Sequence, residues 1–177
     1  MTIETTFQLI LSDYRKAAYY GLVQRNRKAM RIAAFVMLAV LSYTIFMLIS
    51  GGELLYILIY IAGAYLIWGL FLFAKQEREI RSYLQNRDNV LGKDFEMRFD
   101  GKSMWVRLQE KGVDNTFEVR KLAIVFELSE LFIIYATQKD AYLLPKRALE
   151  EEQVKQLRTM FTTQLGDRFE SRFLKRK

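Results

Sequence analysis

The sequence predicts an α+β membrane protein, built from a two-helix transmembrane hairpin and a small antiparallel β-sandwich or partly open barrel. Residues 32–74 carry a single formal charge, which is typical of chain surrounded by lipid. From residue 93 onwards, apolar and polar side chains alternate as they do in half-buried strands. After the last of these strands, apolar positions recur every three or four residues, so we expect a C-terminal helix to cap the sheets.

The composition excludes several kinds of chemistry. The 177 residues include neither histidine nor cysteine, so thiolate nucleophiles, imidazole bases, disulfides and Cys/His metal sites are excluded. The chain also lacks the motifs of phosphate-binding loops, dinucleotide folds, serine hydrolases and zinc proteases. We therefore expect no catalytic residues, no cofactor and no metal, with a lipid-modifying enzyme as a minor alternative.

Residues 1–31 are expected to form a strand and a basic helix that leads to the membrane. Residues 2–9 alternate between apolar and polar side chains, and so short a strand needs partners from the sheet beyond the hairpin. Basic side chains gather on both sides of the hairpin, where they either bind anionic lipid at the membrane surface or only set the topology. They are Arg25, Arg27, Lys28, Arg31, Lys75 and Arg78.

Two uncharged segments, residues 32–52 and 54–74, are each long enough to cross a bilayer once. A helix of 21 residues reaches about 30 Å, the thickness of the hydrocarbon core. Since the glycine-rich link between the segments is short, the two helices are expected to be antiparallel neighbours. Basic residues flank the hairpin and none lies at its tip, so both chain termini are predicted to face the cytoplasm. The predicted location is the cell membrane, with the lipid bilayer as a partner.

Residues 75–92 are expected to form an exit helix or linker, followed by a β domain over residues 93–165. The dipeptide Asp100-Gly101 separates two alternating runs, which is a strong signal for a β-hairpin. Further strands are predicted at residues 113–120, 122–128, 131–136 and 141–144.

The C-terminal end of the chain is expected to hold a helix and a tail. Pro145 ends the last strand, and apolar residues at helical spacing follow it. A sheet of about six strands closed by one helix has the pleckstrin-homology-like (PH-like) layout, and other small β folds fit the same pattern. Residues 166–177 join aromatic and basic groups, so this tail either dips into the inner leaflet or is a frayed, solvated end.

Two segments of the sequence suggest a family. They are "LSDYRKAAYY" ahead of the hairpin and "TFEVRKLAIVFELSELFIIYATQKDAYLLPKRAL" after it. In this order they resemble the YcxB-like membrane proteins of Gram-positive bacteria, over nearly the whole chain. Members of that family often have tryptophan where this chain has Phe117, whereas the tryptophan of this domain is Trp105, on an earlier strand. The resemblance implies a PH-like cytoplasmic domain on a membrane hairpin, with no established activity and no catalytic residues.

The leading functional hypothesis is a membrane-anchored, non-enzymatic binding or regulatory module. Its PH-like domain would engage a protein partner or anionic phospholipid. Nucleic acid is not an expected partner, because the net charge of +7 is concentrated beside the hairpin and at the tail. The alternative is that the protein acts through its helical hairpin, as a small membrane subunit of a transporter or as an immunity-type protein. The small residues of the second helix favour this alternative.

Four cations of the β domain are candidates for a surface that faces lipid or a partner. Two lie on the first predicted hairpin and two follow the last predicted strand. Ordinary solvated surface charge is the alternative explanation. The four are Lys102, Arg107, Lys146 and Arg147.

Overall fold

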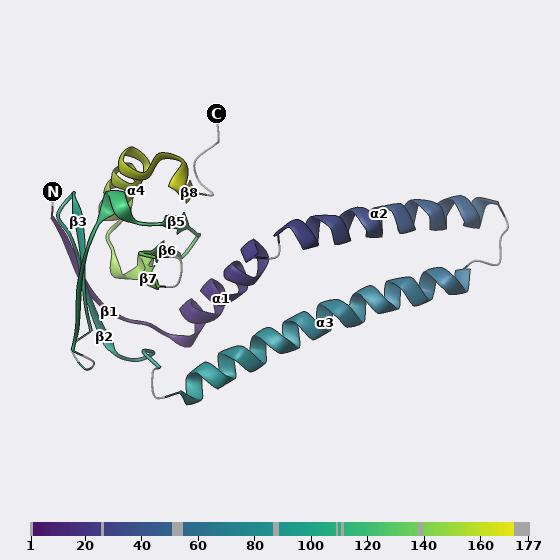
Figure 1. Cartoon of the computed structure of the whole chain (residues 1–177), viewed down its shortest axis with the longest axis horizontal. Coiled ribbons are helices and arrows are strands. Elements are labelled where there is room, and N and C mark those ends of the chain that lie inside the picture. The colour runs from purple at the N-terminus through teal and green to yellow at the C-terminus, as the bar shows by residue number, and fades with distance from the viewer. Residues whose placement is uncertain are drawn as a thin grey trace. The chain divides into compact units, whose positions relative to one another are not determined.

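The computed structural model divides the chain into two compact units (Figure 1). One unit, here called the helical unit, is Ala18–Asn89. The other, here called the sheet unit, combines Met1–Ala17 with Val90–Lys177. The residues that the structure describes are 2–25, 27–50, 55–86, 89–108, 110, 112–137 and 140–171.

The first sheet of the sheet unit has four antiparallel strands in the order β1-β2-β3-β4. Buried and outward side chains alternate along β1, β2 and β3, so one face of this sheet carries core residues. Strand β1 pairs with β2, with Ile3 opposite Phe99. The N-terminal strand therefore finds its partner beyond the helices, as the sequence predicts. The strands are β1 (Ile3–Gln8), β2 (Asp94–Phe99), β3 (Ser103–Leu108) and β4 (Val113–Glu118).

The predicted hairpin of β2 and β3 is confirmed, with Asp100 and Gly101 at its turn. Gly101 has a φ of 89°, a left-handed value that glycine adopts without strain. The Asp100 carboxylate accepts hydrogen bonds from the backbone N–H groups of Lys102 and Ser103, at 2.9 and 2.7 Å. These bonds hold the pKa of Asp100 below its usual range. The turn is thus stabilised by its own few residues.

The second sheet has the order β7-β6-β5-β8, and its last strand is not among those that the sequence predicts. Strand β8 runs parallel to β5, with Phe169 opposite Val125 and its ring buried. Residues 169–171 therefore belong to the sheet and not to a loose tail, while residues 172–177 lie outside the described part of the chain. The strands are β5 (Ile124–Glu127), β6 (Leu131–Tyr135), β7 (Ala141–Pro145) and β8 (Phe169–Ser171).

The predicted C-terminal helix is confirmed as α4 (Glu151–Leu165). It begins with a capping box, in which the side chains of Glu150 and Gln153 each bond to the other residue's backbone. On its buried face, the ring centre of Phe161 lies 6.1 Å from that of Phe99 in the first sheet and 6.0 Å from that of Phe132 in the second. Helix α4 therefore packs against both sheets. Short 3-10 helices of this unit include η2 (Val119–Lys121), η3 (Lys146–Ala148) and η4 (Gly166–Arg168).

Two long helices make up most of the helical unit. They are α2 (Arg27–Ile49) and α3 (Leu55–Gln85), which contact each other, and they are preceded by α1 (Leu11–Arg25). In α1, the ring of Tyr19 stacks on Phe73 of α3 with 5.6 Å between ring centres. The Tyr19 hydroxyl also donates a hydrogen bond to Glu77 of α3, at 2.9 Å. These two contacts join α1 to α3.

The structure contradicts the predicted transmembrane hairpin at residues 32–52 and 54–74. Within the described residues, no helix is both long enough and apolar enough to cross a membrane. Residues 32–49 lie in α2, which begins at Arg27, and residues 55–74 lie in α3, which continues through charged residues as far as Gln85, while residues 51–54, at the predicted link, lie outside the described part of the chain. On this finding, the predictions of a membrane-spanning fold class, of a cell-membrane location and of cytoplasmic termini are wrong. Over the described residues the fold class is α+β, with two four-stranded sheets and four α-helices.

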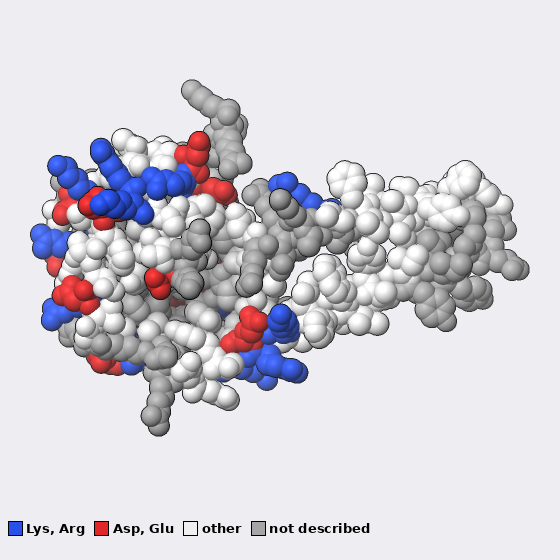
Figure 2. All heavy atoms as spheres, viewed as in Figure 1, with Lys and Arg blue, Asp and Glu red and all other residues white. Residues whose placement is uncertain are grey.

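Large apolar side chains are nevertheless exposed on α2 and α3. Phe35 and Ile49 of α2 are 81% and 82% exposed, and Phe71 of α3 is 64% exposed. Figure 2 shows these two helices white along most of their described length, with charged atoms gathered at one end, whereas charges of both signs are spread over the sheet unit. Extended apolar surfaces of this kind mark interaction sites in proteins.

Candidate binding surface on the first sheet

Two of the predicted surface cations, Lys146 and Arg147, are paired with buried acids. The Nζ atom of Lys146 donates to the Glu127 carboxylate at 2.7 Å and lies 5.1 Å from the centre of the Phe132 ring. The guanidinium of Arg147 makes two hydrogen bonds of 2.6 Å to the buried Asp13 carboxylate, which raise the pKa of Arg147. Both cations therefore take part in holding the sheet unit together.

Replacing Arg147 with alanine is expected to lower the free energy of unfolding of the sheet unit by about 1–3 kcal/mol, because the buried Asp13 carboxylate loses two charged hydrogen bonds. Chemical denaturation of the full-length chain, followed by fluorescence, measures the loss. Lys155→Ala is the matched control, since Lys155 is exposed and pairs only at 3.5 Å with Glu152. Equal stability of the two variants would contradict a structural role for Arg147.

The other two predicted cations, Lys102 and Arg107, lie apart along β3. Lys102 is exposed in the turn before the strand, and Arg107 is exposed near its far end. Five residues of extended chain separate them by about 17 Å. Arg107 lies 3.8 Å from the Glu96 carboxylate of β2. The four cations therefore do not meet in one patch.

The six predicted membrane-surface cations are distributed over the three helices of the helical unit. Arg31 of α2 is exposed, as are Lys75 and Arg78 of α3. The side chains of Arg25, Arg27 and Lys28 lie outside the described part of the structure.

The outward side of the first sheet, here called the outer face, carries more acids than bases. On its four strands and the β2–β3 turn, six carboxylates stand against three cations, which leaves a formal charge of −3. The whole chain has a charge of +7, so this face has the opposite sign to the average. The acids are Glu4, Asp94, Glu96, Asp100, Asp114 and Glu118, and the cations are Arg98, Lys102 and Arg107.

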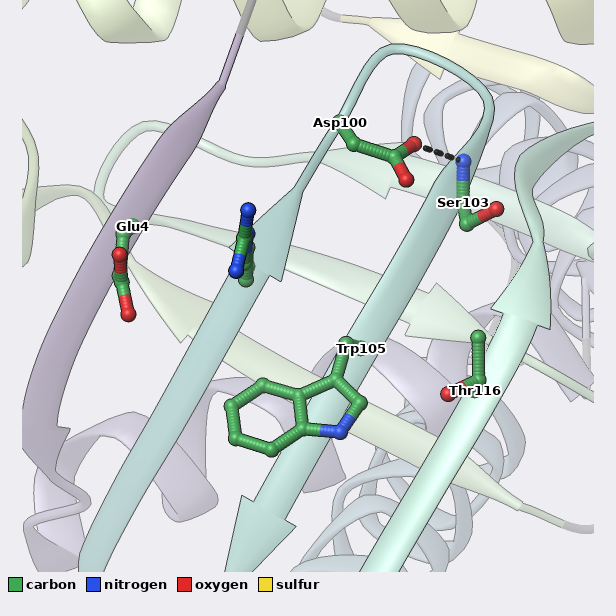
Figure 3. A pocket seen from close by; sticks show the side chains of 6 residues that line it. Glu4, Asp100, Ser103, Trp105 and Thr116 are labelled. Atoms are coloured by element: carbon green, nitrogen blue, oxygen red, sulfur yellow. Dashed lines mark hydrogen bonds between the residues drawn. The ribbon is translucent and has the colours of Figure 1, made fainter.

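A groove of about 350 Å³ lies on this outer face. The pairing of the four strands places Glu4, Arg98, Trp105 and Thr116 in one row across the sheet. Figure 3 shows the indole of Trp105 on β3, between Glu4 of β1 and Thr116 of β4. The indole N–H donates a hydrogen bond of 2.5 Å to Asp114 of β4, which fixes the ring. Asp100 and Ser103 line the groove at the turn of the hairpin.

The alternation of side chains along β3 already indicates this groove in the sequence, whereas the positions of basic residues do not. Met104, Val106 and Leu108 alternate along β3 and are buried, so Trp105 between them must point to the opposite face. A large aromatic side chain on the polar face of a strand is a typical anchor for a partner. The acidic character of the neighbouring strands is visible in the same alternation.

A second group of charged side chains surrounds Glu127 of β5, and these side chains bond to Glu127 itself. The Glu127 carboxylate is fully buried and accepts hydrogen bonds from Arg158 at 2.6 and 2.9 Å, from Lys146 at 2.7 Å and from the Ser171 hydroxyl at 2.6 Å. Burial raises the pKa of Glu127, but the hydrogen bonds from Arg158, Lys146 and Ser171 outweigh it and the net shift is downward. A buried carboxylate that accepts this many bonds is suited to a structural role.

Comparison with known proteins finds no relative of this chain. No protein-family model, curated protein or solved structure matches the chain. The resemblance to YcxB-like proteins therefore stays a prediction. Among the described residues, no group of three or more acidic side chains is arranged to hold a metal ion.

Proposed function

We propose that the chain is a non-enzymatic binding module, in which the outer face of the first sheet takes a basic segment of a protein partner. The observation that carries this proposal is the groove beside Trp105 on an acidic face. A fixed aromatic ring supplies apolar contact area at little cost in conformational entropy. The surrounding carboxylates favour lysine or arginine side chains and raise their rate of encounter.

The charges favour a protein partner over anionic lipid. A phosphate head group would meet the net acidic outer face and be repelled from it. The cations that the sequence offers for lipid, Lys146 and Arg147, instead pair with Glu127 and Asp13. On the first hairpin, Lys102 and Arg107 are exposed, as is Arg98, but they stand among the more numerous acids of the same face, and Arg107 lies 3.8 Å from Glu96.

A selection of random nine-residue peptides on the immobilised full-length chain tests this proposal. We expect the selected peptides to be rich in lysine and arginine and to bind less tightly as salt is added. Replacing Trp105 with alanine is expected to weaken their binding about 30-fold, as the loss of a central aromatic anchor does. Thr163→Ala, on the exposed side of α4, is the matched control.

Two outcomes would overturn the proposal. One is that the selected peptides carry no excess of basic residues, or that they bind the Trp105→Ala variant as tightly as the original chain. The other is binding to vesicles that contain phosphatidylglycerol, if replacing Lys102 and Arg107 with alanine abolishes it. That second result would assign the first hairpin to anionic lipid.

A second candidate function rests on the helical unit. The exposed apolar side chains of α2 and α3, such as Phe35 and Phe71, favour assembly of these helices with an apolar surface of another protein. In this case the helices would be the working part of the chain. Replacing residues 27–85 with an unrelated helical pair separates the two candidates, because peptide binding by the outer face would then persist while this second function would be lost.

A further inference from the structure

We propose that the basic partner segment binds as an additional antiparallel strand on the open edge of β4. This inference rests on the proposed function and specifies how the segment binds. An extended segment on a sheet edge gains affinity from main-chain hydrogen bonds and specificity from alternate side chains. The first sheet is antiparallel throughout, so we infer the same direction for the added strand.

The hydrogen-bond pattern shows which backbone groups of β4 are open. The N–H of Val119 donates to the C=O of Lys102 at 2.8 Å, and bonded pairs recur at every second residue of an antiparallel ladder. Residues 113, 115 and 117 therefore bond to β3. The N–H and C=O groups of Asp114, Thr116 and Glu118 point away from the sheet. Among the described residues, the backbone groups of Asp114 and Thr116 and the N–H of Glu118 have no hydrogen-bond partner, whereas the C=O of Glu118 begins η2.

The other edge of this sheet, β1, is covered at one end within the sheet unit. Strand β1 contacts η3, where the Thr5 hydroxyl donates to the C=O of Ala148 at 2.6 Å. Arg147 of the same segment donates to the C=O of Gln8 at 2.9 Å. In the second sheet, the edge strands are β7, which ends in Pro145, and β8, which has only three residues. Over the described residues, no such bond reaches the outward backbone groups of Asp114 and Thr116 on β4, which lies next to Trp105 on β3, so we take β4 as the edge that the segment joins.

The side chains along the open edge indicate the sequence of the partner. Asp114, Thr116 and Glu118 are exposed on the outer face, and Thr116 lies opposite Trp105. A strand paired with β4 would place three alternate side chains beside them. Lysine or arginine fits the two outer positions, opposite Asp114 and Glu118. An aromatic or large apolar residue fits the middle position, near Thr116 and the Trp105 groove.

The charges of β4 also disfavour a second copy of this chain. Two β4 strands paired edge to edge would bring carboxylates of Asp114 and Glu118 from both copies together, which is destabilising.

The contacts that Asp114 and Glu118 already make do not prevent them from binding a basic partner. Lys121 pairs with Glu118 at 2.9 Å, but both side chains are largely exposed, so this pair is weak and exchangeable. Asp114 accepts the Trp105 N–H through one carboxylate oxygen, which leaves the other for a cation.

The probe is a labelled nine-residue peptide with lysine at positions three and seven, phenylalanine at position five and threonine elsewhere. The full-length chain is titrated with this peptide, and amide hydrogen exchange is followed residue by residue. We expect the Thr116 amide to exchange quickly in the free chain and about tenfold or more slowly with peptide bound. The amides of residues 115 and 117, which already bond to β3, are expected to be protected in both states.

Backbone methylation of the peptide tests the added strand directly. N-methylation at position five removes a donor that faces β4 and is expected to weaken binding about tenfold or more. N-methylation at position four, which points away from β4, is the matched control and is expected to change binding about twofold or less. On the protein, Thr116→Pro removes an outward N–H without removing a ladder hydrogen bond, so it should weaken binding, whereas Thr116→Ala should not.

The outcomes separate this inference from the proposed function. One outcome is that basic peptides bind in a way that depends on Trp105 but is weakened equally by both methylations. This result overturns the added strand, whereas the proposed binding by the outer face still stands. Failure of the designed peptide where selected basic peptides bind overturns the side-chain pattern. Protection of the Thr116 amide that rises with protein concentration alone assigns the edge to a second copy and overturns the inference. If no basic peptide binds, both proposals fall.

Discussion

Replacing Phe161 with alanine is expected to lower the free energy of unfolding of the sheet unit by about 3–5 kcal/mol. The Phe161 side chain is fully buried, and its ring lies close to Phe99 of the first sheet, Phe132 of the second and Phe169 of β8. Removing it leaves a cavity among three other rings that cannot all move inward. One side chain therefore connects α4, both sheets and the last strand.

The loss is measured by chemical denaturation of the full-length chain. The chain has two tryptophans, so a Trp68→Phe background leaves Trp105 to report on the sheet unit alone. Thr163→Ala on the exposed side of the same helix is the control and is expected to change stability by about 0.5 kcal/mol or less. A loss below about 1 kcal/mol for Phe161→Ala would show that α4 is not packed between the sheets as described.

Most of the sheet unit could be predicted because its signals are local. The hairpin of β2 and β3 follows from alternation on either side of Asp100 and Gly101, and α4 follows from a helical apolar pattern after Pro145. Strand β8 could not be found in this way. It has three residues, and its partner β5 lies far back in the sequence. Nothing near Phe169 indicates a parallel pairing at that distance.

The helical unit shows where a composition argument is insufficient. The segments at residues 32–52 and 54–74 lack charge, but this does not fix where a helix begins and ends. In the structure, α2 begins at Arg27, and α3 extends through a charged segment to Gln85. Hydrogen bonds continue along a helix regardless of the polarity of its side chains, so helix bounds need not follow the edges of an apolar run.

The candidate site was only partly accessible from the sequence, and the reason is again distance along the chain. The sequence predicts Lys146 and Arg147 to be surface cations because they are basic and follow a strand. Their partners Glu127 and Asp13 lie 19 and 134 residues away, so the ion pairs appear only after folding. Trp105 differs, since its outward position follows from the alternation of β3 alone.

Replacing Glu127 with glutamine is expected to destabilise the sheet unit by about 3 kcal/mol at neutral pH. The change keeps the shape of the side chain but leaves Arg158 and Lys146 without the buried carboxylate that both of them bind. The value lies at the lower end for a broken buried ion pair, because the side chains of Arg158 and Lys146 are 27% and 14% exposed and keep some contact with water. Denaturation of the Trp68→Phe background measures it.

The dependence of this loss on pH distinguishes charge from packing. The folded-state pKa of Glu127 is lowered, so on acidification the unfolded chain takes up this proton before the folded chain does. The stability that the carboxylate contributes is therefore fully present above the usual carboxyl pKa, about 4.5, and is lost as pH falls through the folded pKa. Other acidic groups titrate equally in both proteins and cancel in the comparison. The stability difference between the original chain and Glu127→Gln should shrink as the pH is lowered from about 7 to 3.

A double-mutant cycle completes the test, because it isolates the interaction of Glu127 with Arg158. If the cost of Glu127→Gln arises from an unpaired cation, Arg158→Leu in the same chain should recover part of it, with a coupling of about 1–3 kcal/mol. A difference that stays constant with pH, together with additive effects of the two substitutions, would mean that Glu127 acts through packing. In that case Ser171, which donates to the same carboxylate, would become the contact that fixes β8.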